Sequence, residues 1–456
     1  MTLKQAKEKV KALSFVVEEL NIYSSIGRRI LLESEFCTDK SLLLHRYAII
    51  TKCESYLSSG ANRKTLKKVR DILACLHDIR GTMKQLASQI TLDDISLFEI
   101  KFFAIEASRI KNLLFDFDCL DLAIDDLENI ISILDPEDLH LNQFYIYNAY
   151  SKELAQKRKA WEEAQEDKKE ALYLQCSELE DTIRQELCTK LFPYKDTLEK
   201  AIQTVGKIDM FFAMAEYFSA NGFSAPEFTQ EISYSQLTYP PLVKKLSEGG
   251  KHYQPIDICL TQAPTLVSGA NMAGKTILLK SLQLAQLLSQ FGFFVPAKQA
   301  KLPLVCDVLT SIGDRQNENE GLSSYGSEIL ILNDIIKKVK QGNQYLVLVD
   351  ELARTTNPKE GVAIVDSFLS ILSNYSSFCV VTTHYFGIKT KCYRLRVKGF
   401  IHSKEQKSVS IADLSSHIDY SLIEDKEERV PNEALNIAEL LGVDSELISK
   451  AREFIK

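Results

Sequence analysis

The chain has 456 residues, of which 45% are hydrophobic and 26% are charged, and this ordinary composition predicts a soluble protein with two or three buried cores. The 55 Lys and Arg residues against 62 Asp and Glu residues give a net charge of -7. This balance excludes a global positive field that would attract nucleic acid or an anionic membrane, but it allows a local basic groove. The charged N-terminus and the lack of a run of about 18 apolar residues predict a cytoplasmic protein without a membrane partner.

The ten cysteines are scattered along the chain. They form no C-x-x-C pair, and no nearby histidine has the spacing of a zinc site. We therefore expect buried thiols in a reducing compartment.

The first 230 residues predict a mostly helical domain. Glycine and proline are sparse there, and apolar residues such as Ile72, Leu73, Leu76 and Ile79 recur at helical spacing. The stretch 151–190 is densely charged and lacks both helix breakers, which predicts one long exposed helix or a helical hairpin. A basic binding arm is the alternative, but residues 152–200 carry 10 basic and 12 acidic side chains, which favours a solvated surface.

The pattern changes near Asn221, Gly222 and Pro226, where turn residues and short apolar runs replace helical periodicity. We place a second domain at 231–425, followed by a small helical segment at 426–456. Within the second domain we expect three buried strands, which are separated by helical segments as in an α/β fold. They are Thr265–Ser268, Tyr345–Val349 and Phe378–Thr382.

A phosphate-binding loop is predicted between the first of these strands and the apolar helix that we expect from Ile277 to Leu288. Its residues are Gly269, Ala270, Asn271, Met272, Ala273, Gly274, Lys275 and Thr276. In this pattern, backbone N–H groups and the start of the helix bind phosphate oxygens. Lys275 would reach the β- and γ-phosphates of ATP and Thr276 would bind Mg²⁺. The alternative is a glycine-rich turn that only joins strand to helix.

Two further strand ends carry polar residues. Asp350 and Glu351 end the second strand, where Asp350 would support Mg²⁺ and Glu351 would polarise the attacking water. Alone, such a pair is commonly a loop start or a helix cap. His384 follows the third strand at the same predicted sheet edge, where it would sense the γ-phosphate, although a single histidine often has no special role.

These segments, together with Phe294-Val-Pro-Ala297 and Thr383-His-Tyr-Phe386, resemble the ATPase domain of MutS proteins in order and spacing. The resemblance implies a P-loop α/β domain of MutS type that follows a helical lever domain, with ATP and Mg²⁺ as cofactors. It also implies a homodimer, or pairing with a homologous subunit. Gly321–Glu328 is similar to the family's segment that faces the nucleotide of the other subunit, so Ser323 and Ser324 would act in trans. A serine-rich helix cap is compatible with that role.

Weaker similarities extend outside this core. Tyr239-Pro-Pro-Leu-Val resembles a strand at the start of the family's ATPase domain, and Tyr253 would stack on adenine or serve only in packing. Asp209 falls near the end of a segment that resembles the lever helices. The stretch 148–158 resembles the start of the clamp, which would be short and span about 150–200. The stretch 434–451 resembles the C-terminal helix-turn-helix that helps the family dimerise.

Departures from the family pattern predict a divergent branch. The chain is too short to contain the mismatch-reading domain as well, and no nuclease module follows the last helices, so we do not expect the usual mismatch contacts. Ala270 and Ala273 replace the Pro and Gly of mismatch-repair members. The segment 350–358, read with Phe144-Tyr-Ile-Tyr, looks like MutS-related ATPases that reactivate adenosylcobalamin-dependent lysine 5,6-aminomutase.

The sequence therefore leaves two main functional hypotheses. In the first, ATP-driven closure of the dimer opens an inactivated aminomutase so that spent cofactor leaves. In the second, closure encircles mismatched or branched DNA in repair or recombination, although the net charge does not support DNA binding. A non-hydrolysing homologue is a third hypothesis, and the joint presence of Lys275, Thr276, Asp350, Glu351 and His384 argues against it.

Overall fold

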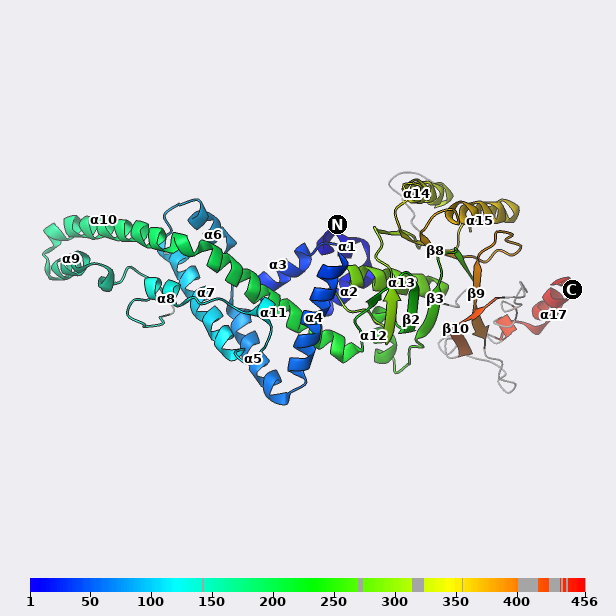
Figure 1. The fold of residues 1–456 in the computed structure, drawn as a ribbon, viewed down its shortest axis with the longest axis horizontal. Coiled ribbons are helices and arrows are strands. Elements are labelled where there is room, and N and C mark those ends of the chain that lie inside the picture. The colour runs from blue at the N-terminus through cyan, green and yellow to red at the C-terminus, as the bar shows by residue number, and fades with distance from the viewer. Residues whose placement is uncertain are drawn as a thin grey trace.

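A computed structural model describes most of the chain. The described residues are 1–141, 143–269, 274–313, 324–354, 356–400, 417–425, 435, 438–439 and 442–455. Figure 1 shows an elongated molecule with a helical arm at one end and two sheets with their covering helices toward the other. The N-terminus lies near the middle, where the arm meets the sheets, and α17 lies at the end opposite the arm (Figure 1).

Helices make up the regular structure before residue 222. They are α1 (Leu3–Lys9), α2 (Lys11–Glu19), α3 (Ser25–Glu33), α4 (Lys40–Leu57), α5 (Gly60–Cys75), α6 (Arg80–Ala87), α7 (Asp94–Leu113), α8 (Glu128–Leu134), α9 (Lys152–Glu163), α10 (Glu166–Leu191) and α11 (Lys195–Asn221), with short 3-10 turns η1 (Leu120–Leu122), η2 (Asn148–Tyr150) and η3 (Phe192–Tyr194). Side-chain caps define several starts, because Ser24, Asp39, Asp93 and Ser151 each accept a hydrogen bond from a backbone N–H group of the first turn. The described residues between α8 and α9 form loop and η2.

The charged stretch forms a helical hairpin of α9 and α10. Arg158 of α9 donates to Glu180 of α10 at 2.7 Å, and Leu154 and Ile183 are among its buried apolar residues. The hairpin occupies the end of the arm that is farthest from the sheets (Figure 1). The long helix α11 then runs back from the arm to the sheets, so it connects the two ends of the molecule.

The second half contains two sheets. The smaller has the strand order β1-β5-β2-β3 and the larger β10-β9-β4-β8-β7-β6. The strands are β1 (Glu227–Phe228), β2 (Ile232–Leu237), β3 (Ile256–Leu260), β4 (Thr265–Ser268), β5 (Gln299–Leu302), β6 (Val308–Ser311), β7 (Leu346–Val349), β8 (Phe378–Thr382), β9 (Tyr393–Phe400) and β10 (Ile418–Glu424). Among the described strands of the larger sheet, β10 runs antiparallel to β9, and the other neighbouring strands run parallel.

Helices cover both faces of the larger sheet. They are α13 (Lys275–Gln290), α14 (Ser324–Val339) and α15 (Pro358–Leu372), while α12 (Pro240–Glu248) precedes β3 and α17 (Ser445–Ile455) lies near the C-terminus. Side chains alternate along β7: Leu346 and Leu348 belong to the core that includes α13, whereas Val347 and Val349 belong to the core under α14 and α15. This two-sided burial explains why the strand is apolar throughout. The mixed helical and α/β architecture agrees with the predicted fold class.

Two sequence predictions are wrong. The expected strand at Tyr239–Val243 is the start of α12, because Pro240 and Pro241 occupy its first turn, where proline has no helical N–H to lose and its fixed φ suits the helix. The cysteines are free but not all buried, since Cys75, Cys259 and Cys306 are exposed. The boundary at residue 230 stays a prediction, and β1 lies just before it and pairs with β5.

Among the helices in the described part of the chain, none is both long and apolar enough to cross a membrane.

Candidate nucleotide site

The site lies where three neighbouring parallel strands end. Strand β8 pairs with β4 on one side and with β7 on the other. The predicted phosphate loop follows β4, the acidic pair follows β7, and His384 lies two residues after β8. Because the carboxyl ends of parallel strands meet at one sheet edge, this strand order brings together residues that are far apart in the sequence.

The start of α13 has the backbone form that the motif predicts. Gly274 has φ +81°, a conformation that side chains disfavour, and it immediately precedes the helix. Lys275 is only 4% exposed, and its Nζ donates to the Gly269 carbonyl at 2.6 Å. The ammonium group of Lys275 therefore lies at Gly269, the first residue of the predicted phosphate loop. Ala270, Asn271, Met272 and Ala273 lie outside the described residues.

Thr276 and Asp350 meet directly. The Thr276 hydroxyl donates to Asp350 Oδ2 at 2.7 Å, and the other carboxylate oxygen accepts from the Thr382 hydroxyl of β8, also at 2.7 Å. The Glu351 N–H in turn donates to Thr382 Oγ1 at 2.8 Å. A hydroxyl and a carboxylate at this distance are the oxygen ligands that Mg²⁺ prefers, so the donor set fits the predicted metal.

Glu351 is close to two cations. Its Oε1 lies 3.8 Å from Lys275 Nζ, and its Oε2 accepts from Arg354 at 3.2 Å. The residue has φ +45°. This backbone conformation is unusual for residues other than glycine and is typical of constrained functional turns. The turn thus directs the carboxylate toward the phosphate loop.

His384 lies within electrostatic reach of the same residues. Desolvation lowers its pKa, the charge of Glu351 opposes this shift, and the charges of Lys275 and Arg354 add to it. The imidazole is therefore expected to be neutral near pH 7, where one ring nitrogen can accept and the other donate a hydrogen bond.

Two tyrosines lie beside α13. Burial raises the pKa of Tyr253, and a hydrogen bond with Ser281 of α13 opposes that shift. Tyr420 of β10 lies against the phosphate loop, since a Cβ placed on Gly274 would be 3.0 Å from its Cδ1 atom. Gln254 joins the two segments: its amide donates to Asp419 at 2.9 Å and its oxygen accepts from the Tyr420 N–H at 3.0 Å.

Sequence reasoning missed Thr382 and Tyr420. Thr382 ends the third predicted strand, so its position at the shared sheet edge was a usable signal. No sequence signal identified Tyr420, because its proximity to Gly274 depends on the pairing of β10 with β9. Of the predicted trans residues, Ser323 lies outside the described residues and Ser324 begins α14.

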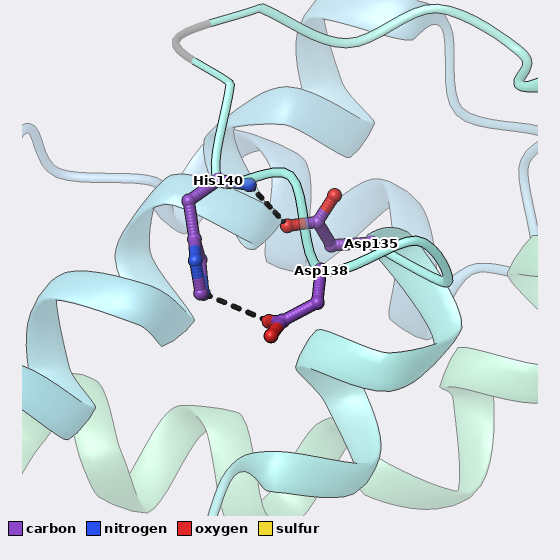
Figure 2. Close-up of side chains that lie close together, drawn as sticks. All are labelled: Asp135, Asp138 and His140. Carbon is purple, nitrogen blue, oxygen red and sulfur yellow. Dashed lines mark hydrogen bonds and ion pairs between the residues drawn. The ribbon is translucent and has the colours of Figure 1, made fainter.

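A second group of possible metal ligands lies in the arm. Asp135, Asp138 and His140 place ligand atoms within 4.8 Å of one another, and Figure 2 shows them on one loop after α8. Asp135 already has partners, since its carboxylate accepts from Lys101 Nζ at 3.0 Å and from the His140 N–H at 2.8 Å. Lys101 is fully buried and also donates to Tyr147 at 2.9 Å. These contacts explain the cluster as a support for the loop.

Comparison with known proteins identifies a family match over the second half of the chain. Residues 265–456 match the MutS domain V model, a P-loop ATPase domain. The chain is 33% identical to "Endonuclease MutS2" of Ligilactobacillus salivarius over 45% of its own length and 26% of the relative's. It is 25% identical to "DNA mismatch repair protein MutS" of Rickettsia bellii, over 61% of this chain and 31% of that protein. For "DNA mismatch repair protein msh3" of Aspergillus niger the identity is 28%, with coverage of 62% and 25%.

The chain thus spans about a quarter to a third of the length of these curated relatives. The three relatives are named as MutS-type proteins, and residues 265–456 contain all the strand ends described above. Residues 265–456 are thus similar to the MutS domain V ATPase domain, and the curated relatives that match this chain have MutS-type names.

Proposed function

We propose that the chain binds ATP·Mg²⁺ and hydrolyses it. The observation that carries the proposal is the 2.7 Å contact between Thr276 of the phosphate loop and Asp350 at the end of β7. A P-loop hydroxyl and a strand-end carboxylate in contact are the two metal-binding components of P-loop ATPases. When bound, Mg²⁺ would neutralise charge on the phosphates.

The protein groups would divide the work as follows. Lys275 would bind the β- and γ-phosphates with a buried charge. Thr382 would orient Asp350, because its hydroxyl already donates to the carboxylate oxygen that Thr276 leaves free. Glu351 would accept a proton from the attacking water or polarise it. Its present contact with Lys275, at 3.8 Å, would be exchanged for phosphate and water contacts when nucleotide is bound.

His384 would contact the γ-phosphate as a neutral imidazole, since burial lowers its pKa. A neutral ring can donate a hydrogen bond to phosphate while it accepts another from water. Tyr420 lies beside Gly274 at the end of the phosphate loop. Tyr253, which contacts the second turn of α13 through Ser281, remains the proposed residue for stacking on adenine.

Turnover would require two subunits. Ser323 and Ser324 precede or begin α14 and would face the nucleotide of the other subunit, as the family resemblance implies. A homodimer is the simplest assembly, and a homologous partner is the alternative. Closure of the pair would move α11 and with it the distal α9–α10 hairpin.

DNA is the favoured partner of the assembly. The relatives are named for mismatch repair or as endonucleases, and this supports the DNA hypothesis over the aminomutase client, for which the comparisons offer no support. The mixed charge of residues 152–200 predicts few phosphate contacts from the hairpin, so binding would depend on shape and on closure of the dimer.

The test measures nucleotide binding and ATP turnover of the purified chain and of Lys275→Ala. Losing a buried charge-assisted contact to phosphate is worth about 1.5–3 kcal/mol, so affinity should fall roughly 10- to 100-fold. Lys298→Ala, which changes an exposed lysine, is the matched control and should bind normally. Equal affinity of wild type and Lys275→Ala would contradict the phosphate assignment.

The partner is identified by adding linear or branched duplex DNA at two salt concentrations, or an inactivated cobalamin aminomutase, to the same assay. Stimulation by DNA that weakens at high salt supports the DNA hypothesis, since phosphate contacts release counterions. Stimulation by the aminomutase alone, with recovery of its activity, would replace DNA by that client.

A further inference from the structure

The turn that carries Glu351 is conformationally constrained. Glu351 has φ +45° and Ala353 has φ +61°. Neither is glycine, and the left-handed region is unfavourable for residues with a Cβ. Such conformations persist only where surrounding contacts hold them, so the contacts of this turn determine where the Glu351 carboxylate points.

Two side chains from different elements hold Ala353. The residue is fully buried, and its N–H donates to Glu328 Oε1 at 3.0 Å. On the other side its carbonyl accepts from the Tyr385 hydroxyl at 2.7 Å. Both backbone groups of the left-handed residue therefore have side-chain partners, as a buried peptide group requires.

Glu328 comes from the start of α14, four residues after its first residue, Ser324. Its carboxyl group is partly buried: burial raises its pKa, and the Ala353 N–H and the charge of Arg354 oppose that shift. Burial of a carboxyl group is unfavourable unless the group forms hydrogen bonds. Glu328 forms such a bond with the Ala353 N–H.

Tyr385 is held in its turn. Its N–H donates to Thr383 Oγ1 at 3.0 Å, and its ring lies on Gly361 of α15, where a Cβ would be 2.5 Å from the ring. The glycine leaves the space that the phenol needs. Tyr385 also follows His384 directly, so one short segment carries both the candidate γ-phosphate sensor and one of the two side-chain contacts to Ala353.

We propose that Glu328 is a positioning residue for Glu351, and that it acts by holding the Ala353 N–H while Tyr385 holds the Ala353 carbonyl. Without the Glu328 bond the turn relaxes toward negative φ and Glu351 loses its alignment with the phosphate loop. Glu328 thereby links α14, whose N-terminal end would face the nucleotide of the other subunit, to the group that activates water. This inference rests on the proposed ATPase function.

The test compares Glu328→Ala, which removes the acceptor, with Glu328→Gln, which keeps an oxygen in the same place. The matched control is Asp334→Ala, on the same helix at an exposed position. We expect Glu328→Ala to lower kcat by about 10- to 100-fold with little change in the KM for ATP, because alignment rather than binding is lost. Glu328→Gln should stay within about threefold of wild type.

Hydrogen exchange of the Ala353 amide gives a second readout that needs no turnover. Exchange should become at least about tenfold faster in Glu328→Ala and remain slow in Glu328→Gln and Asp334→Ala. Tyr385→Phe, which removes only the hydroxyl, should loosen the same turn and covers the case in which Glu328→Ala does not fold.

The outcomes separate the two proposals. If the wild-type protein does not hydrolyse ATP, the proposed function fails, while exchange at Ala353 still tests the Glu328 contact. If turnover is normal and Glu328→Ala changes neither kcat nor the exchange of Ala353, the positioning role is refuted. Equal loss in Glu328→Gln and Glu328→Ala would also overturn it, because the retained oxygen would then have no effect.

Discussion

The two ends of helix α13 are built differently. At its N-terminal end the polar groups meet residues that directly follow strands of the larger sheet: Lys275 donates to Gly269 after β4, and Thr276 donates to Asp350 after β7. At its C-terminal end several of the partners come from the first 50 residues of the chain. Tyr47 donates to the Ser289 carbonyl at 2.6 Å, and the Cys37 N–H donates to the Gln290 carbonyl at 2.8 Å.

The difference indicates two separate roles for one helix. The groups at the first end are a lysine ammonium, a hydroxyl and carboxylates, which bind phosphate oxygens and Mg²⁺, so they suit a ligand that comes and goes. At the other end the Gln290 amide is fully used: it donates to the carbonyls of Cys37 and Val305 and accepts from the Val305 N–H and from Gln286. That end is a fixed joint to the helical half.

The joint continues into the arm through α4. Tyr56 of α4 packs edge-on against Phe212 of α11, with ring centroids 5.9 Å apart. A small displacement of α13 on nucleotide binding would therefore reach α11, because packed cores transmit displacement rather than absorb it.

The largest expected effect is at the ligand end. Glu351→Gln should lower ATP turnover by about 100-fold or more, because an amide cannot accept the proton of the attacking water, while nucleotide affinity stays within a few-fold. Phosphate release and fluorescent-nucleotide titration measure the two quantities. The control is Glu360→Gln, at an exposed position on α15. Undiminished turnover in Glu351→Gln would assign the base role to another group.

An intermediate effect is expected at the joint. Gln290→Leu removes the hydrogen-bond partner of the Val305 N–H and of the Cys37 and Val305 carbonyls, so the free energy of unfolding should fall by about 2–4 kcal/mol. Urea denaturation measures the change. Gln185→Leu, on the exposed surface of α10, should have almost no effect. If nucleotide affinity of the folded Gln290→Leu protein falls as much as in Lys275→Ala, the two ends of α13 are not separable in the way described.

The smallest effect concerns pH and the contact of α11 with α3. Asp209 of α11 is buried and accepts from the backbone N–H and the hydroxyl of Ser24, the N-cap residue of α3, at 2.7 and 2.6 Å. Burial raises its pKa, an effect that the Ser24 and Tyr23 hydrogen bonds and the Arg70 charge oppose only in part.

A carboxyl group with a raised pKa in the folded state holds its proton more tightly there than when unfolded. Its contribution to stability is thus complete at low pH and is lost as pH rises through the folded pKa. The stability of wild type relative to Asp209→Asn should accordingly decline as pH rises from about 4, the ordinary aspartate value. Urea midpoints of both proteins over this range provide the measurement, and a pH-independent difference would contradict the prediction.

Local sequence patterns were sufficient for the framework of the site. The spacing Gly269 to Thr276, the apolar strands and the polar residues at their ends predicted the phosphate loop, the acidic pair and the position of His384. These signals are readable because each depends on neighbouring residues: a glycine where φ is positive, an apolar run for a buried strand, and helical periodicity in the arm.

What the sequence by itself determined, then, is the set of chemical groups and the elements that carry them. Only the tertiary structure decided which groups meet. The order β4-β8-β7 puts Thr382 between Thr276 and Glu351, the pairing of β10 brings Tyr420 to Gly274, and α14 supplies Glu328 to the Ala353 turn. Such contacts join segments that are distant in the chain, so their free energy comes from strand pairing and helix packing that no local pattern encodes. The segment at Tyr239 shows the reverse case. Family resemblance predicted a strand there, but the two prolines, which suit the first turn of a helix, determine the local structure.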